Sequence, residues 1–249
     1  MRPPPSQARW LIVNADDFGQ SDAINRGVIA AHESGIVTSA SLMTRWPSSA
    51  EAAAYGRDHP RLSVGLHLDL GEWAYRDETW VPLYQVARTN DPEAVQRELA
   101  GQLERFRELV GAEPSHLDSH QHVHREEPLH SLMVGAARQL GVPLRDAAPD
   151  LRYDGSFYGQ SSRGYPVPDA ICADALARLI ETLPVGITEL GCHPGTADDV
   201  LDSMYRAERA EELHALCDPR VRAAIRSSGV RLCSFFDLLH DRARATLRS

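Results

Sequence analysis

The chain has 249 residues, of which 43% are hydrophobic and 24% charged, a composition typical of a globular enzyme and unlike that of a disordered or fibrous protein. Its 26 basic and 35 acidic residues give a net charge of -9, which disfavours nucleic acid and an anionic membrane surface as partners. All 26 basic residues are arginine. The absence of lysine excludes Schiff-base, pyridoxal-phosphate and P-loop chemistry, each of which needs a lysine amine.

The N-terminus and the cysteines indicate the cellular compartment that we expect for the protein. The apolar run from Trp10 to Val13 is too short for the core of a signal peptide, and no segment approaches the length of a membrane span. The four cysteines form no C-x-x-C pair and therefore predict neither a zinc ribbon nor a disulfide framework. We expect a cytoplasmic protein with one domain over residues 1–249, of which 1–8 form a flexible tail.

Apolar runs alternate with helical patterns along the whole chain. The predicted strands cover 10–15, 36–43, 62–70, 115–123, 142–145, 187–192 and 230–235. The predicted helices begin after the Ser21-Asp22 cap, at Ser48 or Ser49, at Pro92, at Pro128, at 169 and twice within 197–227, with a further one at the C-terminus. Residues 149–168 fit neither the two-residue period of a strand nor the 3.6-residue period of a helix, so we predict a long loop. We expect this loop, which is rich in aromatic side chains, to cover a site.

Seven strand-helix units in 249 residues average about 35 residues each, which is the size of a βα repeat. Such regular alternation favours an α/β fold with a parallel sheet and helices outside it. We expect the sheet to close in the manner of a barrel and not to stay open.

Polar side chains follow four of the predicted strands, where α/β barrels build their active sites. They are Asp16 and Asp17 after the first strand, His67 and Asp69 in the third, a histidine run in the fourth and His193 after the sixth. Adjacent carboxylates on an extended chain point in different directions, so one of Asp16 and Asp17 can bind a metal while the other handles a proton. Aspartate before glycine is also an ordinary turn sequence, and His67 could be an interior polar group.

The most informative segment is the histidine run from His116 to His124. On a strand its alternate residues share one face, but at roughly 3.3 Å per residue the two ends are about 26 Å apart. At most one or two of these histidines can therefore bind the same ion. A carboxylate with two imidazoles suits Zn²⁺ or another divalent ion, and metal-assisted hydrolysis is the leading reaction class. His193 could add a general acid.

Five segments resemble the YdjC-type carbohydrate deacetylases, which include chitooligosaccharide deacetylases. They are LIVNADDFG at 11–19, GIVTS at 35–39, VGLHL at 64–68, PSHLDSHQHVH at 114–124 and CHPG at 192–195. The resemblance implies a distorted seven-stranded (β/α) barrel of the polysaccharide deacetylase type. It further implies removal of acetyl from an N-acetylated amino sugar with a divalent metal ion, Mg²⁺ or Zn²⁺.

Carried over by position, the resemblance assigns roles to five residues. Asp17, His67 and His120 correspond to the metal ligands, Asp16 to the general base and His193 to a candidate acid. His122, His124 and Asp118 are then orienting residues or sugar contacts. Trp73, Tyr75 and the aromatics of 153–165 could stack on sugar rings, whereas Arg45-Trp46 departs from the small residues expected there. The oligomeric state is left open, a homodimer included.

Two other functions compete with this one. A metal-dependent phosphoester hydrolase would use the same aspartates and histidines and would add a cationic clamp, for which Arg125 or Arg145 could serve. A sugar-binding protein without catalysis is the second alternative. The presence of Asp16, Asp17, His67 and His120 together argues against it.

Overall fold

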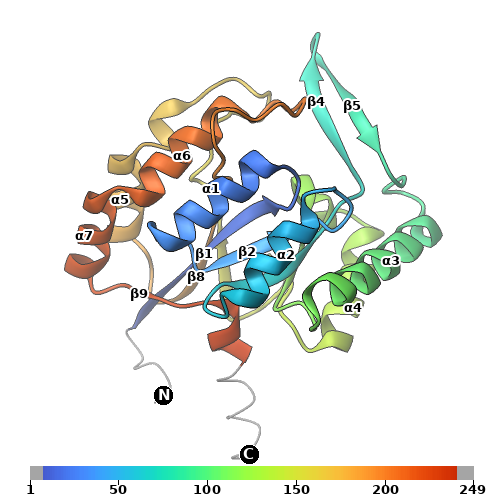
Figure 1. Ribbon diagram of the computed structural model, residues 1–249, viewed down its shortest axis with the longest axis horizontal. Helices are drawn as coiled ribbons and strands as arrows, with labels where there is room; N and C mark the ends of the chain where they lie inside the picture. Colours follow the sequence, from blue (N-terminus) through green and yellow to red (C-terminus); the bar gives the residue numbers. More distant parts are fainter. Residues whose placement is uncertain (1–7, 240–249) are drawn as a thin grey trace, which may run out of the picture.

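A curled parallel β-sheet forms the centre of the fold in the computed structural model, which describes residues 8–239 (Figure 1). The strand order is β6-β3-β2-β1-β8-β7, and β9 pairs with the beginning of β1 beside β2. The strands are β1 (Arg9–Phe18), β2 (Ser39–Leu42), β3 (Ser63–Leu68), β6 (Leu117–Ser119), β7 (Leu151–Asp154), β8 (Gly186–Cys192) and β9 (Arg231–Leu232). This arrangement confirms the predicted α/β class and the distorted, barrel-like curvature, but the expected closure was wrong: β6 and β7 are not paired with each other, so the sheet is a half-barrel.

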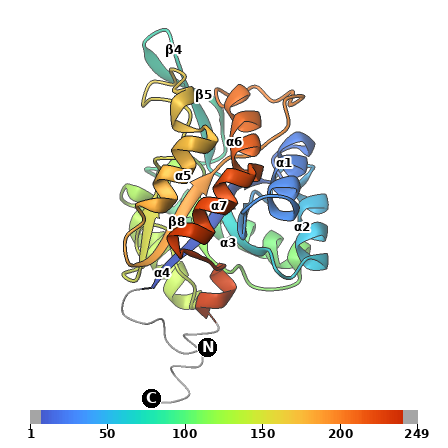
Figure 2. The ribbon, with the colours of Figure 1, turned by 90° about the vertical axis from the view of Figure 1, so that its left-hand side faces the viewer.

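The helices cover the outer side of the sheet (Figures 1 and 2). They are α1 (Asp22–Glu33), α2 (Ser49–Asp58), α3 (Pro92–Val110), α4 (Leu129–Leu140), α5 (Ala173–Glu181), α6 (Ala207–Cys217) and α7 (Pro219–Ser228), with short 3-10 helices η1 (His120–Arg125) and η2 (Pro168–Ala170). The predicted cap of α1 is present, since the Ser21 side chain accepts from the backbone N–H of Ile24, but Ser48 makes no side-chain cap bond at the start of α2. At α3, Asp91 accepts from the backbone N–H of Ala94 at 3.0 Å, and Gly111 ends the helix in a left-handed conformation. None of the described helices is long and apolar enough to span a membrane.

Side chains alternate along β1 between two apolar clusters. Leu11 and Val13 belong to the main core with Ile24 and Val28 of α1, whereas Ile12 packs with Phe235 in a smaller cluster. This is the period-2 alternation of a strand that is covered on both faces. Burial on both faces fixes the register of β1, and therefore the place where its polar C-terminal residues emerge.

A two-stranded hairpin of β4 (Gly71–Arg76) and β5 (Thr79–Gln85) interrupts the alternation and was not predicted. It projects from the end of the molecule opposite to the described chain ends (Figures 1 and 2). Its turn residues Asp77 and Glu78 both have positive φ, 48° and 61°. Two-residue hairpin turns of this geometry usually carry Asn-Gly or Asp-Gly, so Asp-Glu gives little signal in the sequence.

Several predicted boundaries were wrong. Residues 142–145 do not form a strand, and only Leu144 makes a single bridge to Leu117. The segment 149–168, predicted as a loop, contains the strand β7, which pairs with β8. With only four residues, β7 is too short to show a clear strand pattern in the sequence. The strand predicted at 230–235 is present only as the two-residue β9, because a helix begins at Phe235. Residues 1–7 of the predicted flexible tail, and the C-terminal helix beyond 239, lie outside the described residues.

Candidate metal centre

Three side chains from three different strand ends converge, and they are the three that the family resemblance implied as metal ligands. Asp17 lies near the end of β1, His67 in β3 and His120 directly after β6. Asp17 has a φ of 63°, a left-handed conformation that is uncommon for a residue other than glycine. This turn in the backbone directs the carboxylate of Asp17 toward the histidines, whereas the carboxylate of the preceding Asp16 points toward Arg145. Strain of this kind is typical of functional sites.

One oxygen of Asp17 contacts both imidazoles. Its Oδ1 lies 2.9 Å from Nδ1 of His120 and 3.3 Å from Nε2 of His67. One potential ligand atom from each residue lies within 4.8 Å of the others, and all three residues are buried. Ligand atoms around a tetrahedral ion with bonds of about 2.1 Å are separated by about 3.4 Å. A carboxylate and two imidazoles at these separations therefore fit a divalent metal ion.

Asp118 orients the first imidazole. Its Oδ1 lies 2.7 Å from Nδ1 of His67, which turns Nε2 toward Asp17. Burial lowers the pKa of His67, but the carboxylates of Asp118 and Asp16 outweigh it and raise that pKa to about 9. A carboxylate behind a histidine in this way is the usual support of a metal-binding imidazole. The expectation that Asp118 orients a ligand is thus matched by a direct contact.

Arg209 of α6 holds the other oxygen of Asp17. Its Nη2 donates to Oδ2 at 2.7 Å, and its side chain is almost completely buried. Burial alone would raise the pKa of Asp17, but Arg209 and His120 hold it well below its usual value. Sequence reasoning missed Arg209, because one of 26 arginines in the chain, on a helix of ordinary pattern, carries no local signal.

Asp16 lies beside the three ligands, within 4.8 Å of His67, but its carboxylate pairs with Arg145. The guanidinium donates through Nη1 to Oδ2 at 2.7 Å and through Nη2 to Oδ1 at 2.8 Å. Burial opposes ionisation of Asp16, but the bidentate ion pair with Arg145 lowers the pKa of this carboxyl below its usual value. The same guanidinium contacts Asp118 at 2.9 Å and Glu189 at 2.7 Å and is fully buried. Arg145 therefore serves as the shared partner of three buried carboxylates.

His193 lines the same cavity as the three ligands and lies next to Asp16. Its Nε2 is 3.8 Å from Oδ2 of Asp16, and its Nδ1 is 3.8 Å from Oε1 of Glu212. Glu212 is fully buried and also accepts hydrogen bonds from the backbone N–H of His193 and the hydroxyl of Tyr205. This carboxylate on α6 orients the imidazole, and no sequence pattern predicted it.

The histidine run does not continue as a strand. β6 ends at Ser119, and Gln121 and His122 then adopt left-handed backbone angles, with φ of 51° and 54°. The alternation predicted for 115–123 therefore breaks at the point where His120 must turn into the site. The residues after Ser119 form the short 3-10 helix η1.

The remaining histidines of the run have separate environments. His116 stacks on Phe235 with ring centroids 3.8 Å apart, and burial lowers its pKa to about 4. His122 lines the cavity and lies 3.2 Å from the hydroxyl of Tyr153. His124 is fully buried and bonds to a serine hydroxyl through Nδ1. Only His120 of this run reaches the other two ligands.

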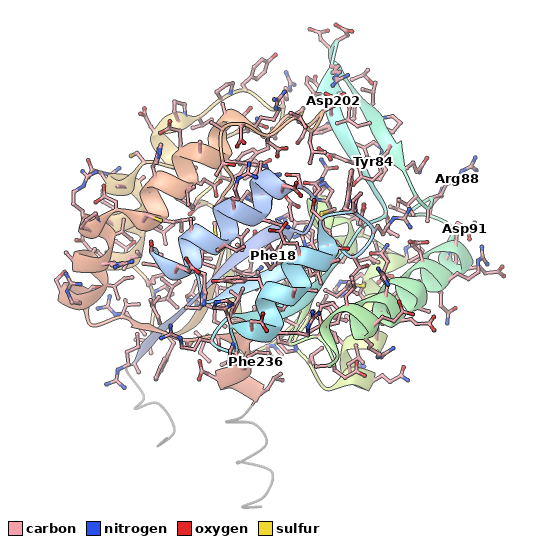
Figure 3. All side chains as sticks on the ribbon, viewed as in Figure 1. Phe18, Tyr84, Arg88, Asp91, Asp202 and Phe236 are labelled. Atoms are coloured by element: carbon pink, nitrogen blue, oxygen red, sulfur yellow. The ribbon has the colours of Figure 1, made fainter. Side chains whose placement is uncertain are left out.

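Asp69 does not join the site, although alternation places it on the face of His67. Its carboxylate instead anchors the root of the hairpin, accepting from the hydroxyl of Tyr84 at 2.9 Å and from the indole of Trp46 at 3.2 Å. Figure 3 shows Tyr84 at this root, and Asp202 near the far part of the hairpin, where it pairs with Arg76.

A cavity of about 830 Å³ opens above these residues. Its floor includes Asp16, Asp17, His67, His120 and His193, and its walls include aromatic side chains from the hairpin and from the 149–168 segment: Trp73, Trp80, Tyr153, Phe157 and Tyr158. The expectation that this segment covers a site holds, but Tyr165 lies 63% exposed away from the cavity. The polar residues of the candidate site and these aromatic side chains therefore line the same open pocket.

Comparison with known proteins identifies the family. A family model described as YdjC-like protein matches residues 10–227. The chain belongs to the YdjC-like family. A carbohydrate deacetylase of Geobacillus stearothermophilus is 35% identical, with 91% of this chain and 97% of that protein covered. A chitooligosaccharide deacetylase of Serratia marcescens is 32% identical, with coverage of 92% and 99%.

Solved structures agree on the fold of this YdjC-like chain. A protein of Enterococcus faecalis, assigned provisionally to cellobiose-phosphate cleavage, superposes with a TM-score of 0.75 at 27% identity, covering 93% of this chain and 99% of that one. A family 4 carbohydrate esterase from Streptomyces lividans, in complex with acetate, superposes with a TM-score of 0.55 at 14% identity and covers 92% of both chains. The second likeness shows the polysaccharide deacetylase type of fold alone.

Proposed function

We propose that this chain hydrolyses the acetamide of an N-acetylated amino sugar with the help of a divalent metal ion. The observation that carries the proposal is the convergence of Asp17, His67 and His120 on one point at the floor of the cavity. Asp16 and His193 lie beside that point, in position to move protons. Membership of a family whose relatives are named deacetylases supports the same reaction.

The ion would be held by Asp17, His67 and His120. When bound, such an ion polarises a carbonyl group and lowers the pKa of water. The donor set favours Zn²⁺ or a similar transition ion over Mg²⁺, because imidazole suits the former and Mg²⁺ prefers oxygen ligands. The site would thus combine a Lewis acid with two proton-handling residues.

Asp16 would act as the general base. Its lowered pKa keeps the carboxylate ionised at neutral pH, so that it can accept a proton from the attacking water. Arg145 fixes both oxygens of this carboxylate, and Asn14 donates to Oδ1 at 2.8 Å. Base and ligand roles are therefore divided between two adjacent aspartates.

His193 would act as the general acid toward the leaving amine. Its Nε2 faces Asp16, while the Glu212 carboxylate lies behind Nδ1. A carboxylate in that position stabilises the protonated imidazole and sets its orientation. Tyr158 and Tyr205 flank the ring, with centroids 5.4 Å and 5.3 Å from it. These aromatic rings limit the access of water to the acid.

The main alternative, phosphoester hydrolysis, lacks the cationic clamp expected for it. Arg145 is fully buried and already paired with three carboxylates, and it therefore faces no substrate. Arg125 lines the cavity but pairs with Asp146 at 2.6 Å. Both arginines named for this role are thus engaged within the protein, which favours amide over phosphate chemistry.

Release of acetate tests the proposal. The protein, loaded with Zn²⁺ or with Mg²⁺, is incubated with N-acetylglucosamine and short chitooligosaccharides, and acetate is measured with an enzymatic assay. We expect acetate from at least one substrate and loss of it after Asp17→Asn. Phosphate release from matched sugar phosphates without acetate release would reverse the ranking of the two hydrolases. Sugar binding without turnover by the metal-loaded protein would support the non-catalytic alternative.

A further inference from the structure

The hairpin contributes a carboxylate to the metal centre. Glu72, the second residue of β4, is 5% exposed although it belongs to a hairpin that projects from the fold. Its Oε2 lies 3.7 Å from Nε2 of His120 and accepts from the side-chain amide of Gln20 at 3.4 Å. A charged side chain is costly to bury without a partner, so this placement needs an explanation.

His120 has an unused ring nitrogen on the same side. Its Nδ1 faces Asp17, whereas its Nε2 is buried without a hydrogen-bond partner. In His67, one ring nitrogen, Nε2, faces Asp17, and the other, Nδ1, is hydrogen-bonded to the carboxylate of Asp118 at 2.7 Å. By analogy, the ring nitrogen of His120 that faces away from Asp17 needs a carboxylate partner. His120 has the reverse orientation, with Glu72 in the place that Asp118 takes behind His67.

The backbone keeps Glu72 in this place. The side-chain amide of Gln121 donates to the carbonyl oxygen of Trp73 and accepts from its backbone N–H, both at 2.9 Å. Gln121 follows His120 in the chain and Trp73 follows Glu72. The hairpin root and the turn that carries His120 are therefore tied together one residue away from the two side chains.

We propose that Glu72 is a positioning residue of the metal centre. With a metal ion at Nδ1, Glu72 would move in from 3.7 Å to accept the Nε2–H of His120, which would fix the tautomer and the ring orientation that present Nδ1 to the ion. The proposal rests on the metal site of the proposed function and extends it to the hairpin. The hairpin is then part of the metal centre as well as a wall of the cavity.

Metal affinity tests this role without substrate. Dissociation constants for Zn²⁺ are measured by competition with a chelating dye for the wild-type chain, Glu72→Ala, Glu72→Gln and the control Glu78→Gln, which removes a carboxylate from the exposed turn of the same hairpin. Loss of an orienting carboxylate weakens metal binding about 10–100-fold, and we expect this for Glu72→Ala. Glu72→Gln should lose less, because its amide oxygen can still accept from Nε2–H, and Glu78→Gln should match the wild type.

The absorption spectrum of the Co²⁺-loaded proteins provides a second readout, because it responds to the geometry of the ligands. We expect altered bands in Glu72→Ala and partial recovery in Glu72→Gln, with circular dichroism like that of the wild type. Wild-type affinity and spectrum in Glu72→Ala would overturn the proposal. So would X-ray absorption data showing that Glu72→Gln removes an oxygen ligand from the ion, because Glu72 would then be a direct ligand. If the metal affinities and spectra come out as expected but the protein releases no acetate, only the proposed deacetylase activity is refuted.

Discussion

Arg209 and Asp17 form a buried ion pair in which Nη2 of the arginine donates to Oδ2 of the aspartate at 2.7 Å. The opposite oxygen, Oδ1, faces His67 and His120. The arginine thus occupies one oxygen of the carboxylate and leaves the other for a metal ion. In the metal-free protein it also compensates a charge that is only 2% exposed.

Replacing Arg209 by methionine should destabilise the metal-free protein more than the metal-loaded one. Without its partner, the Asp17 carboxylate is a buried uncompensated charge, and such a loss costs about 3–5 kcal/mol. A bound cation supplies the missing compensation. Urea unfolding in EDTA and in excess Zn²⁺ measures both costs. Arg220→Met, in a surface pair whose arginine side chain is 62% exposed, is the matched control and should change stability little in either condition. Equal losses for Arg209→Met with and without metal would contradict this account.

The two adjacent aspartates should separate metal binding from turnover. Asp17→Asn and His120→Ala remove ligands and should lose the bound ion. Asp16→Asn should keep one ion per chain but lower kcat about 10²–10⁴-fold, the usual contribution of a general base. Elemental analysis of the purified variants, together with acetate release, distinguishes the two classes. An Asp16→Asn protein without metal would show that Asp16 is needed for binding.

Glu212→Gln tests the support of the proposed acid. The amide oxygen of glutamine can still accept from the backbone N–H of His193, and its NH2 group can donate to the hydroxyl oxygen of Tyr205, so the fold should persist. It carries no charge to stabilise the protonated imidazole. We expect kcat to fall about tenfold or more while KM and metal content stay close to wild type. A change confined to KM would instead place Glu212 in substrate binding.

Glu189 should make stability depend on pH. Burial raises the pKa of this carboxyl to about 7 from an ordinary value of 4.5, although Arg145 opposes the shift. A raised folded-state pKa gives a contribution to stability that is complete below pH 4.5 and is lost as the pH rises through 7. Glu189→Gln cannot lose a proton, so its stability relative to wild type should increase by roughly 2–3 kcal/mol between pH 4.5 and 7.5.

Urea unfolding of the two proteins in EDTA across this pH range gives the comparison. The difference between them is the relevant quantity, because Asp16 and Asp118 titrate in both. A difference that stays constant with pH would show that Glu189 is ionised throughout.

Local sequence was sufficient for the α/β class and for much of the site. The apolar run of β1 with Asp16 and Asp17 at its end, and the cap of α3 at Asp91, are decided by residues close together in the chain. Such local patterns reflect backbone sterics and the need to bury apolar side chains. The family resemblance then selected His120 from its run, which strand alternation could not do.

Only the tertiary structure decided how the chosen residues are held. Arg145, Arg209 and Glu212 come from distant segments, and each is recognisable only by the carboxylate or imidazole that it meets in the folded chain. The hairpin turn and the turn after His120 contain left-handed residues other than glycine. In the second turn, Gln121 and His122 are held by contacts with the distant Trp73 and Tyr153. Sequence therefore determined which groups could do chemistry, and packing of distant segments determined their orientation and charge.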